Sequence, residues 1–378
     1  MGNPERLEVV MDREILIDYL HLALTNGVGS TLLRRLLDHF GSAAAVLTAS
    51  PVELSEVPGV GLVLSRNLRS LEARAFADQT YEICRENGIQ TLLPDSDDFP
   101  RLLNEIPDPP NLLFVRGQLK TTDSLSVAIV GTRTASQYGR AQAARFSRGL
   151  AQAGLTIVSG LARGIDGAAH QAAVEASGRT IAVLSSGVLD IFPPQHAELA
   201  NQIAEHGALI SEMPPGSKPM RGMFPRRNRL ISGLCLATIV IEAAERSGAL
   251  ITARTAGEQG RDVFAMPGLV SSPNARGCHR LIRDGAILIQ DPEDVLEALG
   301  PLVDQVQVSQ EQTVRHPGEL TLNEQETAVL QAIATEPTSI DTVIVSSGLP
   351  VPRVLSTLSV LEMRRLVRRV SGTVVQRT

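Results

Sequence analysis

The sequence predicts an α/β protein organised around a doubly wound parallel sheet, with a small helical domain before it and another small domain after it. Short apolar runs typical of buried strands recur between residues 127 and 289. Helical patterns with polar caps separate the first of these runs, and such alternation is typical of a parallel sheet covered on both faces. The chain of 378 residues is long enough for two or three domains.

Composition is that of an ordinary globular protein, with 43% apolar and 20% charged residues. The N-terminus lacks the pattern of a secretory signal, and no apolar run approaches the roughly 18 residues that span a bilayer. Three widely spaced cysteines indicate a reducing compartment without disulfides. The net charge of −6 argues against a protein that coats nucleic acid indiscriminately.

Residues 1–88 are expected to form a helical domain. Glycine turns at 26–30 and 57–61 each open an apolar helical pattern, at 31–40 and 62–71. This arrangement resembles paired helix-hairpin-helix, or SAM-like, units, in which a helix N-terminus meets a DNA phosphate. A plain packing domain with glycine turns remains the alternative, because residues 1–119 carry 10 basic and 17 acidic side chains.

The proline-rich segment 89–119 is expected to be a connection with one or two short strands. The α/β domain is assigned to residues 120–300. Its expected strands are 127–130, 156–159, 180–184, 208–211, 237–241, 263–266 and 286–289, with helices at 136–154, 166–178 and 195–207.

Residues 301–319 lack apolar periodicity and are assigned to a linker. Residues 320–378 then predict three helices, at 323–334, 339–347 and 351–365, and a strand-like tail, which is the outline of a winged helix. The outward positions of the third helix include Ser356, Ser359 and Glu362. Such a helix is a poor reader of bases, so a protein-contact module is as good an interpretation as a weak DNA module.

Glycine-rich or polar segments follow the first three expected strands, at 131–133, 159–166 and 185–187. The loops at the carboxyl ends of parallel strands meet in one crevice, where such sheets bind ligands. The stretch 224–233 adds three arginines and an amide. Backbone N–H groups and arginines suit phosphates, so the implied ligand carries phosphates. Phe224, Tyr138 or Phe192 would have to supply any platform for stacked bases.

Other chemistry is weakly supported. The first βα turn lacks the glycine fingerprint of dinucleotide-binding proteins. Asp166 and His170 could act as an acid/base pair, but a helix-capping aspartate bonded to a histidine explains the spacing equally well. Glu242 and Glu245 could serve a glycosidic or phosphoryl reaction, yet a carboxylate that orders nearby arginines is the better interpretation. The pair Cys278-His279 has no further ligands at metal spacing, so we expect no metal site and no cofactor.

Five motifs in order resemble the DNA-processing protein A family (DprA, also called Smf). They are the stretches 128–136, 159–170, 224–233, 247–253 and 265–268. The flanking segments match the three-domain form of the family, with a SAM-like domain, an extended Rossmann-like sheet and a winged helix. One departure is Thr132, where serine is common, and it keeps the hydroxyl.

The resemblance implies a cytoplasmic protein that binds single-stranded DNA, protects incoming DNA during natural transformation and loads the RecA recombinase. We expect a binding protein and not an enzyme, because the arginine cluster exceeds what one mononucleotide needs and no nucleophile with a base is evident. The resemblance also implies a homodimer formed through the end of the α/β domain. Leu281, Ile282, Ile287 and Ile289 are the expected interface, because they flank a turn before an edge strand. The alternative is a nucleotide or phosphoribosyl hydrolase on the same scaffold. The expected DNA-binding residues are Gly131, Thr132, Arg133, Ser136, Ser159, Gly160, Arg163, Gly164, Asp166, Gly187, Lys218, Phe224, Arg226, Arg227, Asn228, Arg229, Ser232 and Gly233.

Overall fold

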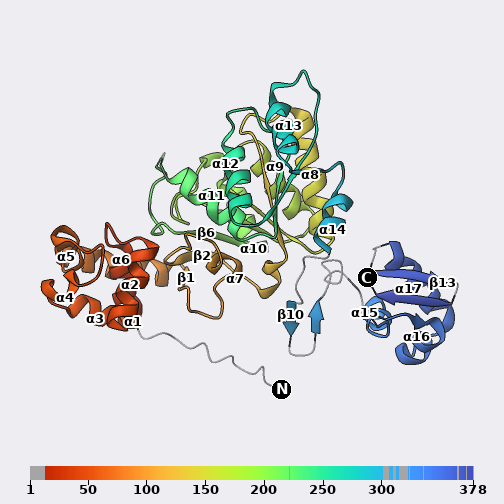
Figure 1. Ribbon diagram of the computed structural model, residues 1–378, viewed down its shortest axis with the longest axis horizontal. Coiled ribbons are helices and arrows are strands. Elements are labelled where there is room, and N and C mark those ends of the chain that lie inside the picture. The colour runs from red at the N-terminus through yellow and green to blue at the C-terminus, as the bar shows by residue number, and fades with distance from the viewer. Residues whose placement is uncertain are drawn as a thin grey trace.

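The computed structural model describes residues 13–220, 222–300, 306–309, 312–314, 322, 324–334, 336–363, 366–371 and 373–377. These residues form a helical N-terminal domain, a central α/β domain and a small C-terminal domain (Figure 1). Within the described ranges no single helix is long and apolar enough to cross a membrane. Two consecutive helices, Ile340–Ser347 and Val351–Glu362, are together long and apolar enough, but the chain bends by 112° between them.

The N-terminal domain contains six helices among the described residues: α1 (Arg13–Leu24), α2 (Ser30–Phe40), α3 (Ala43–Thr48), α4 (Pro51–Ser55), α5 (Leu62–Leu68) and α6 (Leu71–Glu86). Both predicted glycine turns are present, and Gly27 and Gly59 have φ of +99° and +103°. That backbone conformation favours glycine, which explains the residue choice at the two turns. Buried leucines and valines of α2 to α5 form a core of their own.

The proline-rich connection is part of the sheet. Its strands β1 (Gln90–Leu92) and β2 (Leu113–Gly117) flank a short helix, α7 (Arg101–Asn104), and β2 pairs antiparallel with β6 (Ala208–Ser211). The sheet therefore begins at Gln90, about 30 residues before the start assigned from the sequence.

The central sheet has the strand order β1-β2-β6-β5-β4-β3-β7-β8-β9. From β6 to β9 all neighbours are parallel. The order reverses between β3 and β7, the switch point at which open parallel sheets bind ligands. The doubly wound fold is thus confirmed. The remaining strands are β3 (Ser126–Val130), β4 (Thr156–Ser159), β5 (Thr180–Val183), β7 (Ala237–Val240), β8 (Asp262–Ala265) and β9 (Ile287–Leu288).

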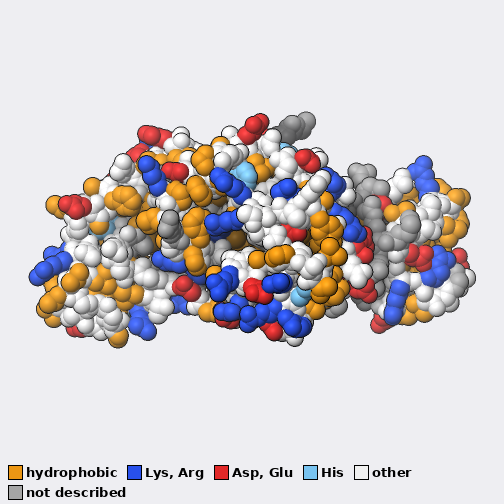
Figure 2. Space-filling view, turned by 90° about the horizontal axis from the view of Figure 1, so that it is seen from above, with side chains coloured by type: hydrophobic (Ala, Val, Ile, Leu, Met, Phe, Trp, Pro, Cys, Tyr) orange, Lys and Arg blue, Asp and Glu red, His pale blue; other side chains and the backbone are white. Residues whose placement is uncertain are grey.

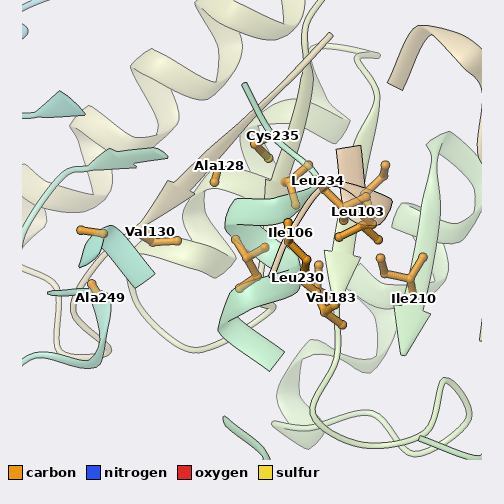
Figure 3. Close-up of a cluster of buried hydrophobic side chains, with 14 of the residues drawn as sticks. Leu103, Ile106, Ala128, Val130, Val183, Ile210, Leu230, Leu234, Cys235 and Ala249 are labelled. Atoms are coloured by element: carbon orange, nitrogen blue, oxygen red, sulfur yellow. The ribbon is translucent and has the colours of Figure 1, made fainter. Parts of the chain in front are cut away.

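Helices cover both faces of this sheet (Figure 1). One face packs against α8 (Gln137–Gln152), α9 (Ile165–Glu175) and α14 (Pro292–Leu299). The other packs against α7, α11 (Met223–Gly233), α12 (Gly248–Glu258) and α13 (Arg276–Arg283), and Figure 3 shows Leu230 and Leu234 between Leu103, Ile106 and Val183. The helix α10 (Ala197–His206) joins α1 and α6 in a third cluster, which ties the N-terminal domain to the sheet.

The C-terminal domain has the predicted winged-helix order. It contains α15 (Glu324–Gln331), β12 (Thr338–Ser339), α16 (Ile340–Ser347), α17 (Val351–Met363), β13 (Val367–Ser371) and β14 (Val374–Arg377). Its three strands pair in the order β12-β14-β13. Inside the stretch assigned to a linker, β10 (Val306–Ser309) and β11 (Gln312–Val314) pair as an antiparallel hairpin.

Candidate nucleic-acid interface

A carboxylate of the protein itself, that of Glu242, occupies the switch point of the sheet. Glu242, the second residue after β7, accepts hydrogen bonds from the backbone N–H (3.0 Å) and hydroxyl (2.6 Å) of Ser136. Ser136 also caps α8 as predicted, because its hydroxyl oxygen accepts from the Gly139 N–H at 2.9 Å. A negative group therefore already lies at the helix N-terminus that would otherwise attract a phosphate. The interpretation that Glu242 orders the arginines was wrong.

The loop after β4 packs directly on the loop after β3. Gly164 has a φ of +83°, and a Cβ there would lie 2.3 Å from the Thr132 carbonyl oxygen. Only glycine fits so close an approach. The neighbouring Ile165 N–H donates to the same carbonyl at 3.3 Å. The loops that carry Thr132 and Gly164 are therefore in direct backbone contact at the carboxyl edge of the sheet.

Asp166 and His170 are both buried, and they form hydrogen bonds with different segments of the chain. Asp166 lies within α9 and accepts a hydrogen bond from the Gly160 N–H at 3.2 Å. The Nδ1 atom of His170 is 2.7 Å from the Thr180 hydroxyl. Burial lowers the pKa of His170 to about 3, so the imidazole is neutral. The expectation that Asp166 caps the helix and bonds His170 was wrong, because Gly164 is the capping residue.

Arg227, one of the three clustered arginines, lies in the interior of the protein. Only 5% of its surface is exposed, and its Nη1 donates to the Val183 carbonyl at 2.7 Å. A Cβ on Gly160 would lie 1.7 Å from Nη1, so the guanidinium supports the β4 loop from below. Burial lowers the pKa of Arg227 to about 10, and the charge of Asp166 opposes that shift. Burial also raises the pKa of Asp166, and Arg227 opposes it in turn. The two buried charges stabilise one another beneath the loop.

An exposed aromatic and cationic cluster lies above this loop surface. The guanidinium of Arg133 is 4.8 Å from the centroid of the Phe224 ring, within the range of a cation–π contact. The Phe192 ring meets Phe224 edge-on, at 6.3 Å between centroids, and 44% of Phe192 is exposed. The cluster joins segments that follow β3, β5 and β6. Arg133 and Phe192 are exposed and Phe224 is half-buried, so the cluster presents a cation and one aromatic ring to solvent.

Further basic groups are exposed on this domain. Arg163, Lys218 and Arg226 are all exposed, and the Arg163 guanidinium donates to the Gln195 side-chain oxygen at 3.4 Å. The Gly187 N–H donates to the Ser217 carbonyl at 2.8 Å, which fixes the loop that carries Lys218 to the end of β5. Figure 2 shows Lys and Arg side chains across the middle of the molecule, with hydrophobic side chains between them.

Three of the expected contact residues are held inside the structure. Arg229 pairs with Glu212 (2.6 Å) and with Asp108 (3.1 Å), and only 12% of its side chain is exposed. Ser232 is fully buried and donates to Gln259 at 2.6 Å, and Gly233 packs against Leu103 and Ile106 of the connection. These residues pack α11 against its neighbours, and they do not contribute to the exposed surface. No sequence pattern identified Glu212 or Asp108 as the partners of Arg229.

The structure separates the roles of two clustered arginines. Arg226→Ala is expected to weaken single-stranded DNA binding and to lower the slope of log K against log salt by about 0.7, because one phosphate contact is lost. Arg229→Ala should leave that slope unchanged and destabilise the fold by about 1–3 kcal/mol, because it leaves Glu212 without its partner. Fluorescence titrations at several salt concentrations, paired with urea unfolding, measure both. A shallower salt slope in the Arg229 variant would contradict the assignment.

Metal and thiol chemistry find no support in the ranges that the structure covers. No group of three or more histidine, cysteine, aspartate or glutamate side chains there is placed to hold a metal ion. Cys278 is buried and burial raises the pKa of its thiol to about 12, whereas His279 bonds the backbone of Gly268. The two adjacent side chains therefore point to different surroundings.

Comparison with known proteins places the chain in a family. A family model described as DNA recombination-mediator protein A matches residues 90–300, a DprA winged helix domain matches 314–373, and a SAM-like helix-hairpin-helix tandem matches 20–74. Protein Smf of Synechocystis is 38% identical over 95% of this chain and 98% of its own length. Protein Smf of Escherichia coli is 43% identical over 86% of this chain and 88% of its own.

Solved structures agree with the sequence relatives. DNA processing protein A from Streptococcus pneumoniae superposes with a TM-score of 0.64 at 34% identity, over 74% of this chain and 96% of that protein. The Helicobacter pylori protein, whose structure is described as showing its single-stranded DNA binding mode, has a TM-score of 0.51 at 30% identity, over 56% of this chain and 95% of that one. The resemblance inferred from the motifs is confirmed, and the chain belongs to the DNA recombination-mediator protein A family, whose members carry the names DprA and Smf.

Proposed function

We propose that this protein binds single-stranded DNA along the carboxyl edge of its sheet and acts as a recombination mediator. In this role it protects incoming DNA in the cytoplasm and loads the RecA recombinase onto it during natural transformation. The observation that carries the proposal is the exposed cluster of Arg133, Phe224 and Phe192, set among further exposed basic residues. The single-stranded DNA binding described for the Helicobacter pylori relative supports it.

The cluster suits unpaired bases. Aromatic rings bind the π-face of any base, and cations beside them take the flanking phosphates, so recognition is tolerant of sequence. In a duplex the base faces are stacked on one another and unavailable to such rings. The exposed Arg133, Arg163, Lys218 and Arg226 supply several anion contacts. That number exceeds what one mononucleotide requires.

The same features disfavour the hydrolase alternative. Glu242 is fully engaged with Ser136, so it is not free to act on a substrate. Asp166 is buried and bonded to Gly160, and His170 is buried and neutral. General acid–base catalysis requires a group within reach of the substrate and with a pKa near the working pH. We therefore propose a binding protein and not an enzyme.

Binding and hydrolysis can be tested in one assay. The full chain should bind a labelled oligothymidylate and leave it intact, whereas thymidine monophosphate at the same concentration should not compete. Chromatography of the nucleotides after incubation measures any product. Competition by the monophosphate, or release of a base or phosphate, would favour the hydrolase. Recombinase loading is tested separately, as faster RecA assembly on strands coated by single-strand binding protein.

A homodimer through β9 is proposed on its exposed edge. Among the described residues the strand pairs with β8 and with no other strand, and Ile287 and Leu288 are 42% and 44% exposed. Leu281 and Ile282 of α13 are half-buried beside it. Ile289, expected in the interface, is fully buried in the core of the domain, because it faces α14. Leu288 takes its place in the proposed interface.

Placing charged side chains on this apolar edge strand should give monomers. Ile287→Arg with Leu288→Glu buries charges in an apolar isologous contact, which costs several kcal/mol per interface. Light scattering measures the mass, and circular dichroism checks the fold. A matched change on another exposed pair, Leu269→Arg with Val270→Glu, should leave the mass unchanged. A dimeric β9 variant would place the interface elsewhere.

The winged helix should contribute little to single-stranded DNA affinity. Residues 320–378 carry a charge balance of only +1, and Arg369 is already paired with Glu362 at 2.8 Å. The exposed positions of α17 include Val351 and Leu355, which cannot read base edges. A chain ending near residue 318 should bind within about threefold of the full chain. A loss of tenfold or more on a long oligonucleotide, with a shallower salt slope, would show the domain to be a second DNA site.

A further inference from the structure

The second helical hairpin of the N-terminal domain exposes an apolar surface that the proposed DNA-binding function does not use. Val52 on α4 and Leu62 and Val63 at the start of α5 are 72%, 74% and 72% exposed. All three come from two adjacent short helices joined by the turn at 57–61. Isolated exposed apolar residues are common, but a contiguous group of them marks an interaction site.

The two hairpins of this domain differ in chemistry. The first helix after a glycine turn, α2, begins with Ser30 and Thr31 and carries Arg34 and Arg35. At the equivalent positions α5 has Leu62 and Val63 in place of Ser30 and Thr31, and it keeps an arginine, Arg66, in place of Arg34. A hairpin that approaches a phosphate places polar groups at the first two of these positions, because apolar side chains pressed against an anion remove its hydration without replacing it. The second hairpin is therefore suited to a protein surface.

A hollow beside these residues adds charge to the apolar surface. It has a volume of about 320 Å³ and is lined by Pro51, Leu62, Ser65, Arg66 and Arg69. Both arginines are exposed, and within the described residues neither has an ion-pair partner. The nearby acidic residues are engaged elsewhere, since Glu53 of α4 closes a capping box with Ser50, and Glu56, just after α4, lies 4.0 Å from His39. The rim of the hollow is thus positive in an otherwise acidic domain.

We propose that this hollow is a docking site for a short acidic segment of a partner protein that carries one or two large apolar side chains. The apolar side chains enter between Pro51 and Leu62, and the carboxylates meet Arg66 and Arg69. The hollow is open to solvent, so the apolar side chains of the partner lie against Pro51 and Leu62 at its surface. Val52 and Val63 extend the apolar contact beyond the hollow. The site is separate from the cluster around Phe224.

A model peptide tests the chemistry directly. The probe is a fluorescein-labelled peptide of four aspartates followed by leucine and phenylalanine, titrated against the full chain. We expect saturable binding that weakens with salt. A peptide with serines in place of leucine and phenylalanine, and one with lysines in place of the aspartates, should each bind at least tenfold more weakly. Equal binding of all three peptides, or of none, would overturn the proposal.

Variants locate the site. Leu62→Ser with Val63→Ser, and separately Arg66→Glu with Arg69→Glu, should each reduce peptide affinity at least tenfold. These side chains are exposed, so the thermal unfolding midpoint should stay unchanged. Leu71→Ser, at an 86% exposed position on α6, is the matched control and should bind as the parent does. If the variants lose affinity for a DNA duplex or change the oligomeric state while peptide binding persists, the surface serves DNA or a second copy and the proposal is wrong.

Discussion

Replacing Arg133 by glutamate is expected to reduce affinity for single-stranded DNA about a hundredfold, or about 2.7 kcal/mol. The side chain is exposed and lies over Phe224, so it can meet a phosphate while the ring takes a base. A hydrogen bond to a charged group contributes about 1.5–3 kcal/mol, and a carboxylate at that position adds repulsion. Arg133→Ala should cost less, about tenfold. Fluorescence anisotropy with a labelled oligothymidylate measures both variants.

The matched control for Arg133→Glu reverses the charge of Arg148, on the helix α8 that follows the Arg133 loop. Arg148 lies on α8 about 16 Å along the helix from its start and pairs with Glu175 at the surface. Arg148→Glu changes the net charge by the same amount but removes only a surface ion pair. It should bind within about twofold of the parent. Equal losses in the Arg133 and Arg148 variants would mean that overall charge, and not this cluster, governs binding.

Arg227→Met is expected to destabilise the protein by about 3 kcal/mol, the largest effect on stability among these predictions. The substitution removes the buried cation whose charge opposes the burial of Asp166, and it leaves the Val183 carbonyl without its donor. The methionine side chain fills much of the same space. Urea unfolding at neutral pH measures the change. An unchanged unfolding midpoint would show that the two buried charges are independent.

The loss should depend on pH. Burial raises the pKa of Asp166 in the folded protein above its unfolded value of about 3.9, and loss of Arg227 raises it further. A raised carboxyl pKa gives stability that is fully present below the unfolded pKa and is lost as pH rises through the folded pKa. The difference in unfolding free energy between parent and variant should therefore be smaller at about pH 5 than at about pH 8.

A second substitution tests the cause. Asp166→Asn removes the carboxylate but keeps an oxygen that can accept the Gly160 N–H. In an Asp166→Asn background, Arg227→Met should cost less than in the parent, and the pH dependence of that cost should disappear. Strictly additive losses in the double variant would show that Arg227 acts only through the Val183 carbonyl.

The sequence predicted the sheet because each strand from β3 to β8 is a short, mainly apolar run. The connection was harder to place. Its strands β1 and β2 are short and lie among prolines, and only their pairing with β6 shows that they extend the sheet. The sequence also did not show that Ile289 is buried in the core. The edge strand before it, β9, has only two residues, which is too few to show which side chains alternate inward.

The sequence predicted which loops form the site, but not which of their side chains are buried. The run of Arg226, Arg227 and Arg229 reads as one charged patch in the sequence, yet α11 turns each side chain in a different direction. Arg226 points to solvent, Arg227 to the interior and Arg229 to Glu212 and Asp108. Partners so distant in the chain leave no local signal. The same holds for Glu242, whose contact with Ser136 spans 106 positions.

Hydrogen exchange of the full chain, with and without a saturating oligothymidylate, tests the central claim most directly. Bound DNA should slow exchange in the loops 131–136 and 159–164 and at the start of α11, because these segments carry Arg133, Arg163 and Phe224 and should open less often when DNA holds those side chains. The N-terminal hairpins and the winged helix should exchange as they do without DNA. Protection confined to those flanking domains, with the carboxyl edge of the sheet unchanged, would contradict the account.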